Sequence, residues 1–388
     1  MRKRLTALAL TGVLVLGLMG CGNTSSKAPE ATDDTSAAAT STDTAEPVSS
    51  EMEELIKAAQ AEGTLTVYGS CEEAYLSAAC QKFTELYGIN VDFQRLSTGE
   101  VYTKIEEENG SPSGDVWFGG TTDPYNEASV AGLLEPYAAI NSGSLIGDTY
   151  KDADNNWYGI YKGILGFMVN KEEIERLNLK VPQDWDDLIK PEYEGLIGMS
   201  NPSTAGTAKL IINTMIQMKG HDEAMKYFQA LDKNVYQYTK SGSGPSKMVG
   251  SGECVIAIGF LHDGISQILT GYDNIELVIP SSGTSYEIGA TAIFKGAKHP
   301  NAAKLWIEYA LTPDCVNVAK ENGSYQFLVI SDATQPEEAI SFGLDPNNVI
   351  EYDFEDAKNN TATYVEDFFQ AVTNGSSDSA DSSRFLLE

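Results

Sequence analysis

The sequence predicts an α/β protein with two lobes and a ligand site between them. Apolar segments of strand length alternate with segments of helical periodicity, a pattern typical of sheets flanked by helices. About 335 residues follow a polar N-terminal region, and one hydrophobic core rarely supports a domain of that size. Short Ser/Thr/Gly segments follow several strands, at the positions where open α/β sheets bind ligands. We therefore expect two α/β lobes with mainly parallel sheets.

The N-terminus has the pattern of a secretory signal. Basic residues occupy positions 2–4, and an apolar run extends over residues 5–19. Such a run is short for a membrane-spanning helix and favours a signal peptide over residues 1–20. The following Leu-Met-Gly-Cys sequence at 18–21 resembles the lipobox of bacterial lipoproteins. This resemblance implies cleavage after Gly20 and a diacylglyceryl group on Cys21, and two acyl chains anchor a protein stably to a membrane.

Residues 21–50 predict a flexible acidic tether. This segment consists mainly of Ser, Thr, Ala, Asp, Glu, Gly and Pro, with almost no large apolar side chains. It cannot bury enough surface to offset the entropy of ordering. We expect it to let a globular body on a lipid anchor reach neighbouring membrane proteins.

The globular part begins with a regular alternation of elements. A helix over 72–87 is the clearest of them, because Leu76, Ala79 and Phe83 share one face and Gly88 follows as a stop signal. Further helices are predicted at Glu53–Glu62, Val101–Glu108, Gly206–Lys219, Glu223–Leu231 and Asp353–Asn374. Strands are predicted at Leu65–Tyr68, Ile89–Phe93, Asp115–Phe118, Gly159–Tyr161, Leu165–Val169, Leu196–Met199, Val235–Tyr238, Cys254–Gly259 and Ile275–Ile279.

Four segments of small polar residues lie where predicted strands lead into helices. They are Gly69–Ser70, Gly119–Thr122, Asn201–Thr207 and Ser241–Pro245. Each can cap a helix, and each can also present hydroxyl and backbone donors to a ligand at a helix N-terminus. Their occurrence in separate parts of the chain predicts that they form the rim of one cleft. The last segment lacks the spacing of a P-loop.

Composition excludes several classes of partner and site. The chain has 26 Lys and Arg against 56 Asp and Glu. This charge disfavours nucleic acid and anionic membrane surfaces as partners.

Cys71 and Cys80 are too far apart along one predicted helix to form a disulfide and are expected to be buried thiols, whereas a disulfide between Cys254 and Cys315 stays open. With only three histidines and no zinc-type spacing, we expect neither a metal site nor a cofactor.

Longer segments resemble one known family. Glu62–Ser70, Asn201–Thr207, Ser241–Glu253, Tyr286–Ala290 and Lys295–Ala303 resemble the branch of bacterial solute-binding proteins that bind ferric ion, thiamine, phosphonates or hexose phosphates. The resemblance covers about residues 50–330. It implies a type II periplasmic-binding-protein fold, with two lobes that are joined by crossing strands and close on the ligand. The family layout places 64–162 plus 280–330 in lobe 1 and 163–279 plus 331–388 in lobe 2.

The resemblance also implies a function. Members of this family capture a small solute outside the cytoplasm and deliver it to the permease of an ABC importer. We expect a lipid-anchored, extracytoplasmic monomer of this kind, on the outer face of the plasma membrane or in the periplasm. Ferric-binding members carry an adjacent tyrosine pair after the strand corresponding to Cys254–Gly259, but this chain has Phe260-Leu261-His262-Asp263 there. The departure argues against iron, because Fe(III) prefers phenolate oxygens.

The predicted ligand is a small phosphorylated or phosphonate-type solute. Its anionic end is expected at hydroxyl groups that open helices, and its other end at a histidine and carboxylates that resemble those of hexose-phosphate-binding members. The predicted ligand-binding residues are Ser70, Thr121, Ser203, Thr204, Thr207, Ser243, His262, Asp263 and Glu287. Hydroxyls on the ligand would indicate a sugar phosphate and an ammonium group an aminoalkyl phosphonate. Thiamine, a polyamine and ferric ion remain alternatives within the family.

An extracytoplasmic hydrolase is the alternative from another class. It would require a nucleophile elbow, a zinc-binding helix or a Cys–His pair. The first two motifs do not occur in the sequence, and only Cys71 and His262 could supply the third. We therefore expect a protein without enzymatic activity.

Overall fold

The computed structural model describes residues 49–373. The predicted signal peptide, the predicted lipidation site Cys21 and all but the last two residues of the predicted tether lie outside the described residues, as does the end of the last predicted helix. Between residues 49 and 373, no helix is both long and apolar enough to cross a membrane. The described residues 49–373 belong to one compact unit by their contacts.

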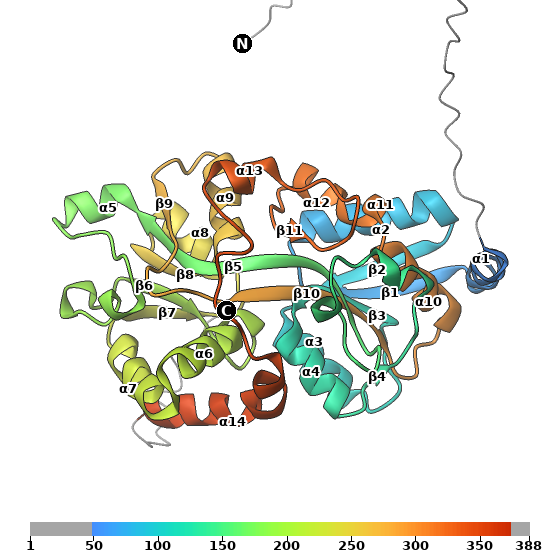
Figure 1. Cartoon of the computed structure of the whole chain (residues 1–388), viewed down its shortest axis with the longest axis horizontal. Coiled ribbons are helices and arrows are strands. Elements are labelled where there is room, and N and C mark those ends of the chain that lie inside the picture. Colours follow the sequence, from blue (N-terminus) through green and yellow to red (C-terminus); the bar gives the residue numbers. More distant parts are fainter. Residues whose placement is uncertain (1–48, 374–388) are drawn as a thin grey trace, which may run out of the picture. The chain divides into compact units, whose positions relative to one another are not determined.

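The strands lie side by side in the sheet in the order β2-β1-β3-β10-β5-β8-β6-β7 (Figure 1). The short strand β4 pairs with β10, and the short strands β9 and β11 pair with β5. The first lobe contains β1 (Thr64–Gly69), β2 (Asn90–Arg95), β3 (Val116–Thr121), β4 (Leu134–Glu135), β10 (Tyr286–Phe294) and β11 (Phe327–Leu328). The second lobe contains β6 (Ile197–Ser200), β7 (Val235–Thr239), β8 (Ile256–Phe260) and β9 (Ile275–Val278).

One strand, β5 (Tyr158–Asn170), belongs to both lobes. Its first half pairs with β10 and β11, and its second half pairs with β8 and β9. All 13 of its residues are buried, and Figure 1 shows it running from one group of elements to the other beside β10. The expected fold of two α/β lobes joined by crossing strands is confirmed.

The expectation of mainly parallel sheets is wrong. The parallel pairs are β1–β2, β1–β3, β6–β7 and β6–β8. Every ladder that β5 or β10 makes is antiparallel. The reason is topological, since a strand that returns from one lobe to the other must run against its neighbours in the sheet. The sheet is therefore mixed.

Two further differences concern the crossing strands. Gly159–Tyr161 and Leu165–Val169 were predicted as separate strands, but both are parts of β5. Lys162 and Gly163 interrupt the apolar pattern between them, although Lys162 pairs with Ile288 and Phe327 in the ladders. β10 was not predicted as a strand at all, because Gly289, Ala290 and Thr291 weaken its apolar run.

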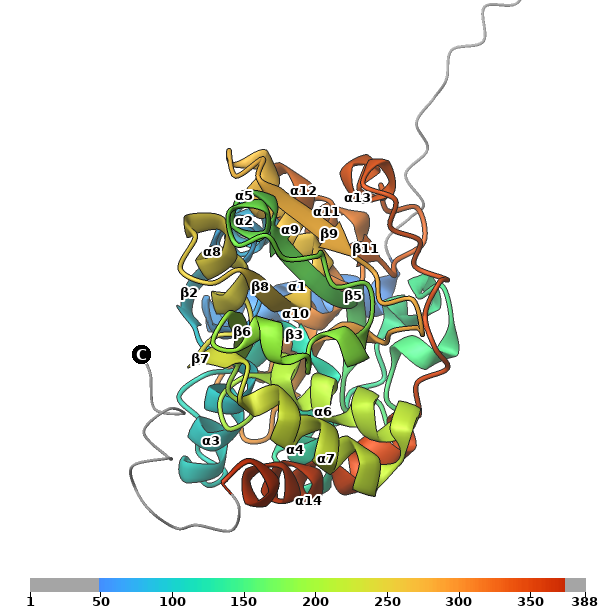
Figure 2. The same ribbon diagram turned by 90° about the vertical axis from the view of Figure 1, so that its left-hand side faces the viewer.

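Helices cover the sheet in both lobes (Figures 1 and 2). The helices are α1 (Ser50–Glu62), α2 (Glu73–Tyr87), α3 (Thr98–Glu107), α4 (Thr122–Val130), α5 (Lys171–Arg176), α6 (Gly206–Lys219), α7 (His221–Asp232), α8 (Gly244–Ser251), α9 (Leu261–Leu269), α10 (Pro300–Ala310), α11 (Pro313–Val316), α12 (Val318–Glu321), α13 (Glu337–Ser341) and α14 (Phe354–Val372). Short 3-10 turns lie at Ile140–Ser144, Asp148–Tyr150, Trp185–Asp187 and Pro191–Tyr193.

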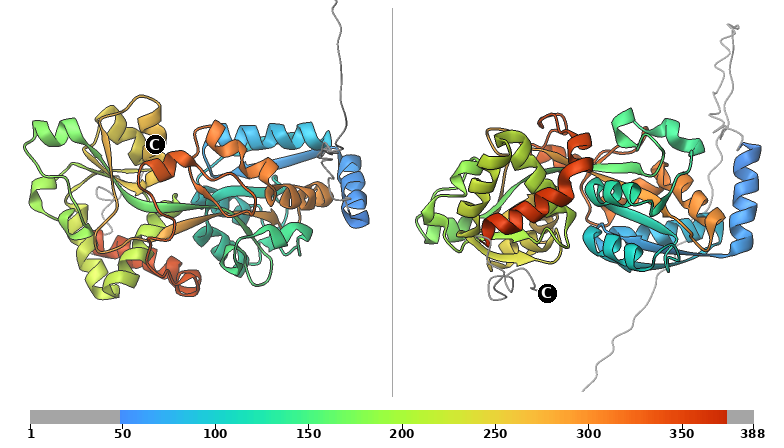
Figure 3. Two further views of the ribbon diagram at one scale, coloured as in Figure 1. Left: turned by 45° about the horizontal axis from the view of Figure 1, so that its top comes forward. Right: turned by 90° about the horizontal axis from the view of Figure 1, so that it is seen from below.

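Each lobe has its own hydrophobic core. In the first, Phe83 of α2 packs against Trp306 and Tyr309 of α10 with ring centroids 5.2 and 5.4 Å away. In the second, Phe228 of α7 packs against Phe368 of α14 at 5.1 Å. Helix α14 lies against α6 and α7 and also contacts α4 of the first lobe, as the view from below in Figure 3 shows. The residue boundaries proposed for the two lobes stay a prediction.

Cysteines do not cross-link the described part of the chain. Cys71, Cys80, Cys254 and Cys315 are all buried and free. The prediction of buried thiols at Cys71 and Cys80 is confirmed, and the pair between Cys254 and Cys315 that the sequence left open does not form.

Candidate ligand-binding cleft

Helix N-termini from both lobes meet at one cavity. It lies between the lobes and encloses ≈ 430 Å³ of empty space, part of which opens to solvent. Helices α2, α3 and α4 reach it from the first lobe, and α6, α8 and α9 from the second. The lining residues are Ser70, Cys71, Glu72, Arg95, Ser97, Thr98, Gly120, Thr121, Tyr161, Ala205, Gly206, Thr207, Gly242, Ser243, Phe260, His262, Asp263 and Glu287.

Most of these helices begin without a side-chain cap. Only α3 has one, in the form of a capping box between Ser97 and Glu100. The cap residues of the others make no side-chain cap hydrogen bond, and they are Glu72, Thr121, Ala205, Ser243 and Phe260. Each uncapped end contributes a partial positive charge and backbone donors. The arrangement favours an anionic group in the cavity although the whole chain is acidic, because distant surface charge is screened over ~10 Å.

Hydroxyl groups and one arginine form one set of lining groups, named the hydroxyl end of the cavity. Thr121 is 3% exposed, and its buried Oγ1 has no hydrogen-bond partner among the described residues. The Trp117 indole N–H donates to Ser70 Oγ (3.0 Å), which fixes that hydroxyl at the cavity wall. Arg95 donates from Nε to the Cys71 carbonyl at 3.2 Å and from a guanidinium nitrogen to Ser241 Oγ at 3.4 Å. This end therefore offers donors and a positive charge to an anion.

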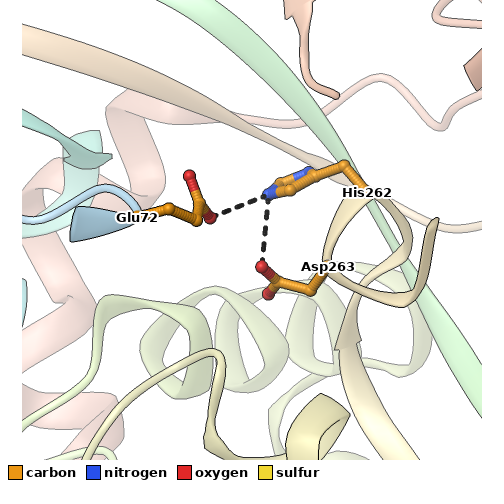
Figure 4. Close-up of side chains that lie close together, drawn as sticks. All are labelled: Glu72, His262 and Asp263. Carbon is orange, nitrogen blue, oxygen red and sulfur yellow. Dashed lines mark ion pairs between the residues drawn. The ribbon is translucent and has the colours of Figure 1, made fainter. Parts of the chain in front are cut away.

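A histidine surrounded by carboxylates forms a second set of lining groups, named the acidic end, which borders the first, because Arg95, Ser243, Glu72 and Asp263 also line one adjoining hollow. His262 Nε2 is 3.9 Å from a carboxylate oxygen of each of Glu72, Asp263 and Glu287. Figure 4 shows Glu72 and Asp263 directed at the same ring nitrogen. The side chains of His262, Asp263 and Glu287 are only 5, 7 and 3% exposed, and His262 Nδ1 has no hydrogen-bond partner within the described chain. The imidazole also stacks on Phe260 of the preceding strand.

Burial sets the protonation of this acidic end. It raises the pKa of Asp263 and Glu287 well above the usual range, and the charge of Glu72 adds to this effect. Burial also lowers the pKa of His262 to about 4, so the ring is neutral near pH 7. Glu72 differs: burial opposes its ionisation, but His262 and the hydrogen bonds from Ser324 and Gln326 hold its pKa below the ordinary value. The cluster can both donate and accept hydrogen bonds, which suits hydroxyl groups.

The same cluster could also bind a metal cation. Glu72, His262 and Asp263 each offer one ligand atom, and these atoms lie within 4.8 Å of one another. One imidazole nitrogen and two carboxylate oxygens form a donor set that divalent transition metals accept.

Comparison with known proteins identifies the family. Residues 125–339 match the model of the family described as bacterial extracellular solute-binding protein. The chain belongs to this family. An uncharacterized protein of Haemophilus influenzae is 38% identical over 304 residues, covering 76% of this chain and 86% of the relative.

Two solved structures are similar to this chain in sequence as well as in fold. The periplasmic binding protein AfuA from Actinobacillus pleuropneumoniae, with exogenous fructose-6-phosphate bound, is 34% identical, with a TM-score of 0.77 over 80% of this chain and 99% of that one. The periplasmic binding protein P5PA is 30% identical, with a TM-score of 0.76 over the same shares.

The structure brings most of the predicted ligand residues of this solute-binding protein together. Those that line the cavity are Ser70, Thr121, Thr207, Ser243, His262, Asp263 and Glu287. Ser203 and Thr204 do not line it. Ser203 is exposed, and Thr204 donates from Oγ1 to the Lys240 carbonyl at 2.8 Å. Their segment serves the contact between the lobes, since the Thr204 carbonyl accepts from Gly99 N–H at 3.0 Å.

Sequence reasoning missed several lining residues. Arg95 ends β2, and Glu72 lies three residues after the end of β1. Such positions at the carboxyl ends of strands could have indicated both residues. Thr98 opens α3, which the sequence predicted only from Val101. Tyr161 could not be found in this way, because it belongs to an apolar strand pattern, yet its hydroxyl reaches the cavity and accepts from Gly120 N–H at 2.7 Å.

Direct contacts join the lobes around the cleft. The N–H of Gly206, the first residue of α6, donates to Thr98 Oγ1 at 2.9 Å. A Cβ on Gly206 would lie 1.9 Å from Thr121 Oγ1, so only glycine permits this approach of the lobes. Lys240, which follows β7 of the second lobe, and Glu100 of α3 in the first lobe form an ion pair at 2.8 Å. The described conformation is therefore a closed one.

Proposed function

We propose that the chain is the extracytoplasmic solute-binding component of an ABC importer and that its solute is a hexose phosphate or a close analogue. The observation that carries the proposal is a single cavity lined by two chemically different sets of groups, the hydroxyl end and the acidic end, which border each other. Uncapped helix N-termini and hydroxyls form one end, and a neutral histidine among buried carboxyl groups forms the other. The similarity to AfuA, whose structure holds fructose-6-phosphate, supports it.

The phosphate is assigned to the hydroxyl end. Ser70, Thr121, Thr207 and Ser243 supply donors there, and the unpartnered Thr121 Oγ1 is available for one phosphate oxygen. The N-termini of α4, α6 and α8 add backbone donors and favourable dipoles. Arg95 adds a positive charge beside them, held in place by its bond to the Cys71 carbonyl.

The sugar is assigned to the acidic end. Its hydroxyls can donate to Glu72, whose pKa is low, and can exchange hydrogen bonds with Asp263 and Glu287, whose pKa is raised. The unpartnered His262 Nδ1 adds one more donor or acceptor. The mixed protonation of this end favours hydroxyl groups over the ammonium of an aminoalkyl phosphonate, since an ammonium only donates. Ferric ion is disfavoured, because Phe260 and Leu261 stand where ferric-binding members carry phenols.

We further propose that the protein acts outside the cytoplasm on a lipid anchor at Cys21 and that it has no enzymatic activity. The lipobox at 18–21 and the polar segment behind it support the anchor. Membership of a solute-binding family supports a binding role rather than a catalytic one.

The test is a panel of ligands in thermal-shift and calorimetric titrations. Fructose-6-phosphate and glucose-6-phosphate are compared with fructose, glucose and inorganic phosphate, so that each half of the ligand is tested alone. A hexose phosphate should raise the melting temperature, by about 2.7 kcal/mol of stability at a hundredfold excess over its Kd, and neither half should do so alone.

Aminoethylphosphonate, thiamine, spermidine, ferric citrate and zinc complete the panel. Stabilisation by one of these compounds with no response to any sugar phosphate would overturn the assignment of the ligand. A tight response to zinc alone would instead assign the Glu72–His262–Asp263 cluster to a cation.

A further inference from the structure

A second cavity lies on the opposite face of the crossing strand. Alternate residues of β5 point to opposite sides of the sheet. Tyr161 lines the ligand cleft, and a Cβ on Gly163 would lie 2.7 Å from both Glu287 and His262, which also places Gly163 on the cleft side. Lys162, between them, lines a separate cavity with ≈ 1020 Å³ of empty space, part of it open to solvent.

The walls of this cavity are largely apolar. They come from β5, β11, α13 and the segments around residues 146–150 and 344–347. The apolar lining residues are Ile146, Tyr150, Phe327, Leu328, Val329, Ile340, Leu344 and Pro346. Ile146 and Ile340 are 58 and 56% exposed. Exposed apolar side chains around a hollow are a mark of a binding site.

Lys162, a largely buried lysine, supplies the positive charge of this cavity. Lys162 is only 7% exposed, and its Nζ lies 3.7 Å from the centroid of the Tyr286 ring. No carboxylate or carbonyl oxygen of residues 49–373 accepts a hydrogen bond from this amine, although an ammonium group has three donors. Burial lowers its pKa to about 8, against a smaller opposing effect of Asp345. The ring satisfies one side of the cation and leaves the other without a hydrogen-bond acceptor.

The other polar lining groups do not supply that acceptor. Gln335 exchanges hydrogen bonds with the Leu328 backbone at 2.8 and 2.9 Å. Asp345, on the rim, accepts from the Asn347 N–H at 2.8 Å. The lining residues therefore offer one buried positive charge, an apolar wall and one negative charge at the mouth.

We infer that this cavity is a second binding site, distinct from the solute cleft, for a small organic monocarboxylate with an apolar body. The carboxylate meets Lys162 Nζ, and the apolar body lies along Phe327, Leu328 and Leu344. A single negative charge matches the single amine, whereas a phosphate dianion would carry excess charge past the carboxylate of Asp345. A neutral compound of the same shape would leave the amine without an acceptor.

The experiment uses octanoate as the probe and needs no variant for its first step. Octanoate, 1-octanol and octylamine are titrated into the wild-type protein by calorimetry near pH 7. Octanoate should bind saturably at one site, and the other two compounds at least about tenfold more weakly, because a hydrogen bond to a charged group is worth that much. Equal binding of octanol or octylamine, or the absence of saturable octanoate binding, would overturn the inference.

Variants then test whether octanoate binds at Lys162. Lys162→Met keeps the length of the side chain and removes the charge, so octanoate binding should fall at least about tenfold. Lys304→Met is the matched control, since Lys304 also lies over a tyrosine ring, Tyr137, but lines neither cavity. It should bind octanoate as the wild type does. Unchanged binding by Lys162→Met would contradict the proposed site.

A chemical measurement covers the case in which Lys162→Met does not fold. An amine with a lowered pKa reacts readily with acylating reagents, and octanoate should protect Lys162 of the wild-type protein from acetic anhydride in peptide mass mapping. Protection of Lys304 or of no lysine would contradict the assignment. Both readouts are independent of the solute in the main cleft.

Discussion

The carboxylate of Glu127 on α4 and the ammonium of Lys209 on α6 form an ion pair at 2.6 Å that joins the two lobes. Their side chains are only 14 and 9% exposed, and both carboxylate oxygens accept from Nζ. The pair lies one turn inside each helix, behind the N-termini that line the cleft. It can form only when the lobes approach, so it stabilises the closed conformation specifically.

Lys209→Met should therefore weaken solute binding without unfolding the protein. Removal of one partner of a largely enclosed ion pair leaves the Glu127 carboxylate uncompensated and costs at least about 1 kcal/mol of closure, which corresponds to a rise in Kd of at least roughly fivefold, expressed mainly as faster dissociation. Stopped-flow dissociation of fructose-6-phosphate measures this effect. Lys226→Met is the control, because Lys226 pairs with Glu223 within α7 and both are about two-thirds exposed. Equal dissociation rates for the two variants would disprove the role of the pair.

Glu287→Gln should stabilise the empty protein and weaken its binding of solute. The unliganded protein keeps a carboxyl group in a buried site beside Glu72 and Asp263, where ionisation is costly. A neutral amide of the same shape carries no such cost, so the empty variant should be more stable near pH 7.5, where the unfolded chain gains by ionising Glu287. Calorimetric melting without solute should show a melting temperature several degrees higher, while titration with fructose-6-phosphate should show a Kd at least about tenfold higher. A variant that is both less stable and equally tight in binding would contradict this account.

Asp123→Asn should change the pH dependence of stability. Burial, with Glu127 nearby, raises the pKa of Asp123 to about 7, whereas an unfolded aspartate titrates near 4. Between these values the folded protein holds a proton that the unfolded chain has lost, so this group makes stability fall as pH rises from about 4 to about 7. Denaturant titrations should show that the variant gains stability relative to the wild type across this range.

The control for Asp123→Asn is Asp148→Asn at a side chain that is 99% exposed. It should leave the difference between pH 4.5 and pH 7.5 unchanged. If the wild type and Asp123→Asn lose stability in parallel as pH rises, the carboxyl group does not bind a proton in the folded state.

Cys21→Ala should release the protein from the membrane with its solute binding intact. The acyl chains are expected on this side chain alone, and the globular body begins well after it. Fractionation of producing cells, followed by thermal-shift assay of the released protein, measures both properties. Equal membrane retention of the variant and the wild type would exclude Cys21 as the anchor.

The sequence predicted those parts of the cleft that depend on local chemistry. Thr121, Thr207 and Ser243 were predicted because small polar residues that lie between a strand and a helix can present donors to a ligand as well as cap the helix. Ser203 and Thr204 share that local pattern but do not line the cavity, and no periodicity shows in which direction a loop turns. Long-range pairing was also not predicted: β10 inserts between β3 and β5, which have only the short β4 between them in the sequence, and only the tertiary structure shows this.

The position of β10 has a consequence for how the protein reaches its native state. The first lobe cannot complete its sheet from residues 64–170, because β10 separates β3 from β5 and is synthesised after all the strands of the second lobe. Contacts of this kind, distant along the chain, slow folding. The second lobe has no such gap between β5 and β9 and can collapse first. A polypeptide that emerges from a translocation channel N-terminus first would thus acquire its structure in the reverse order of its lobes.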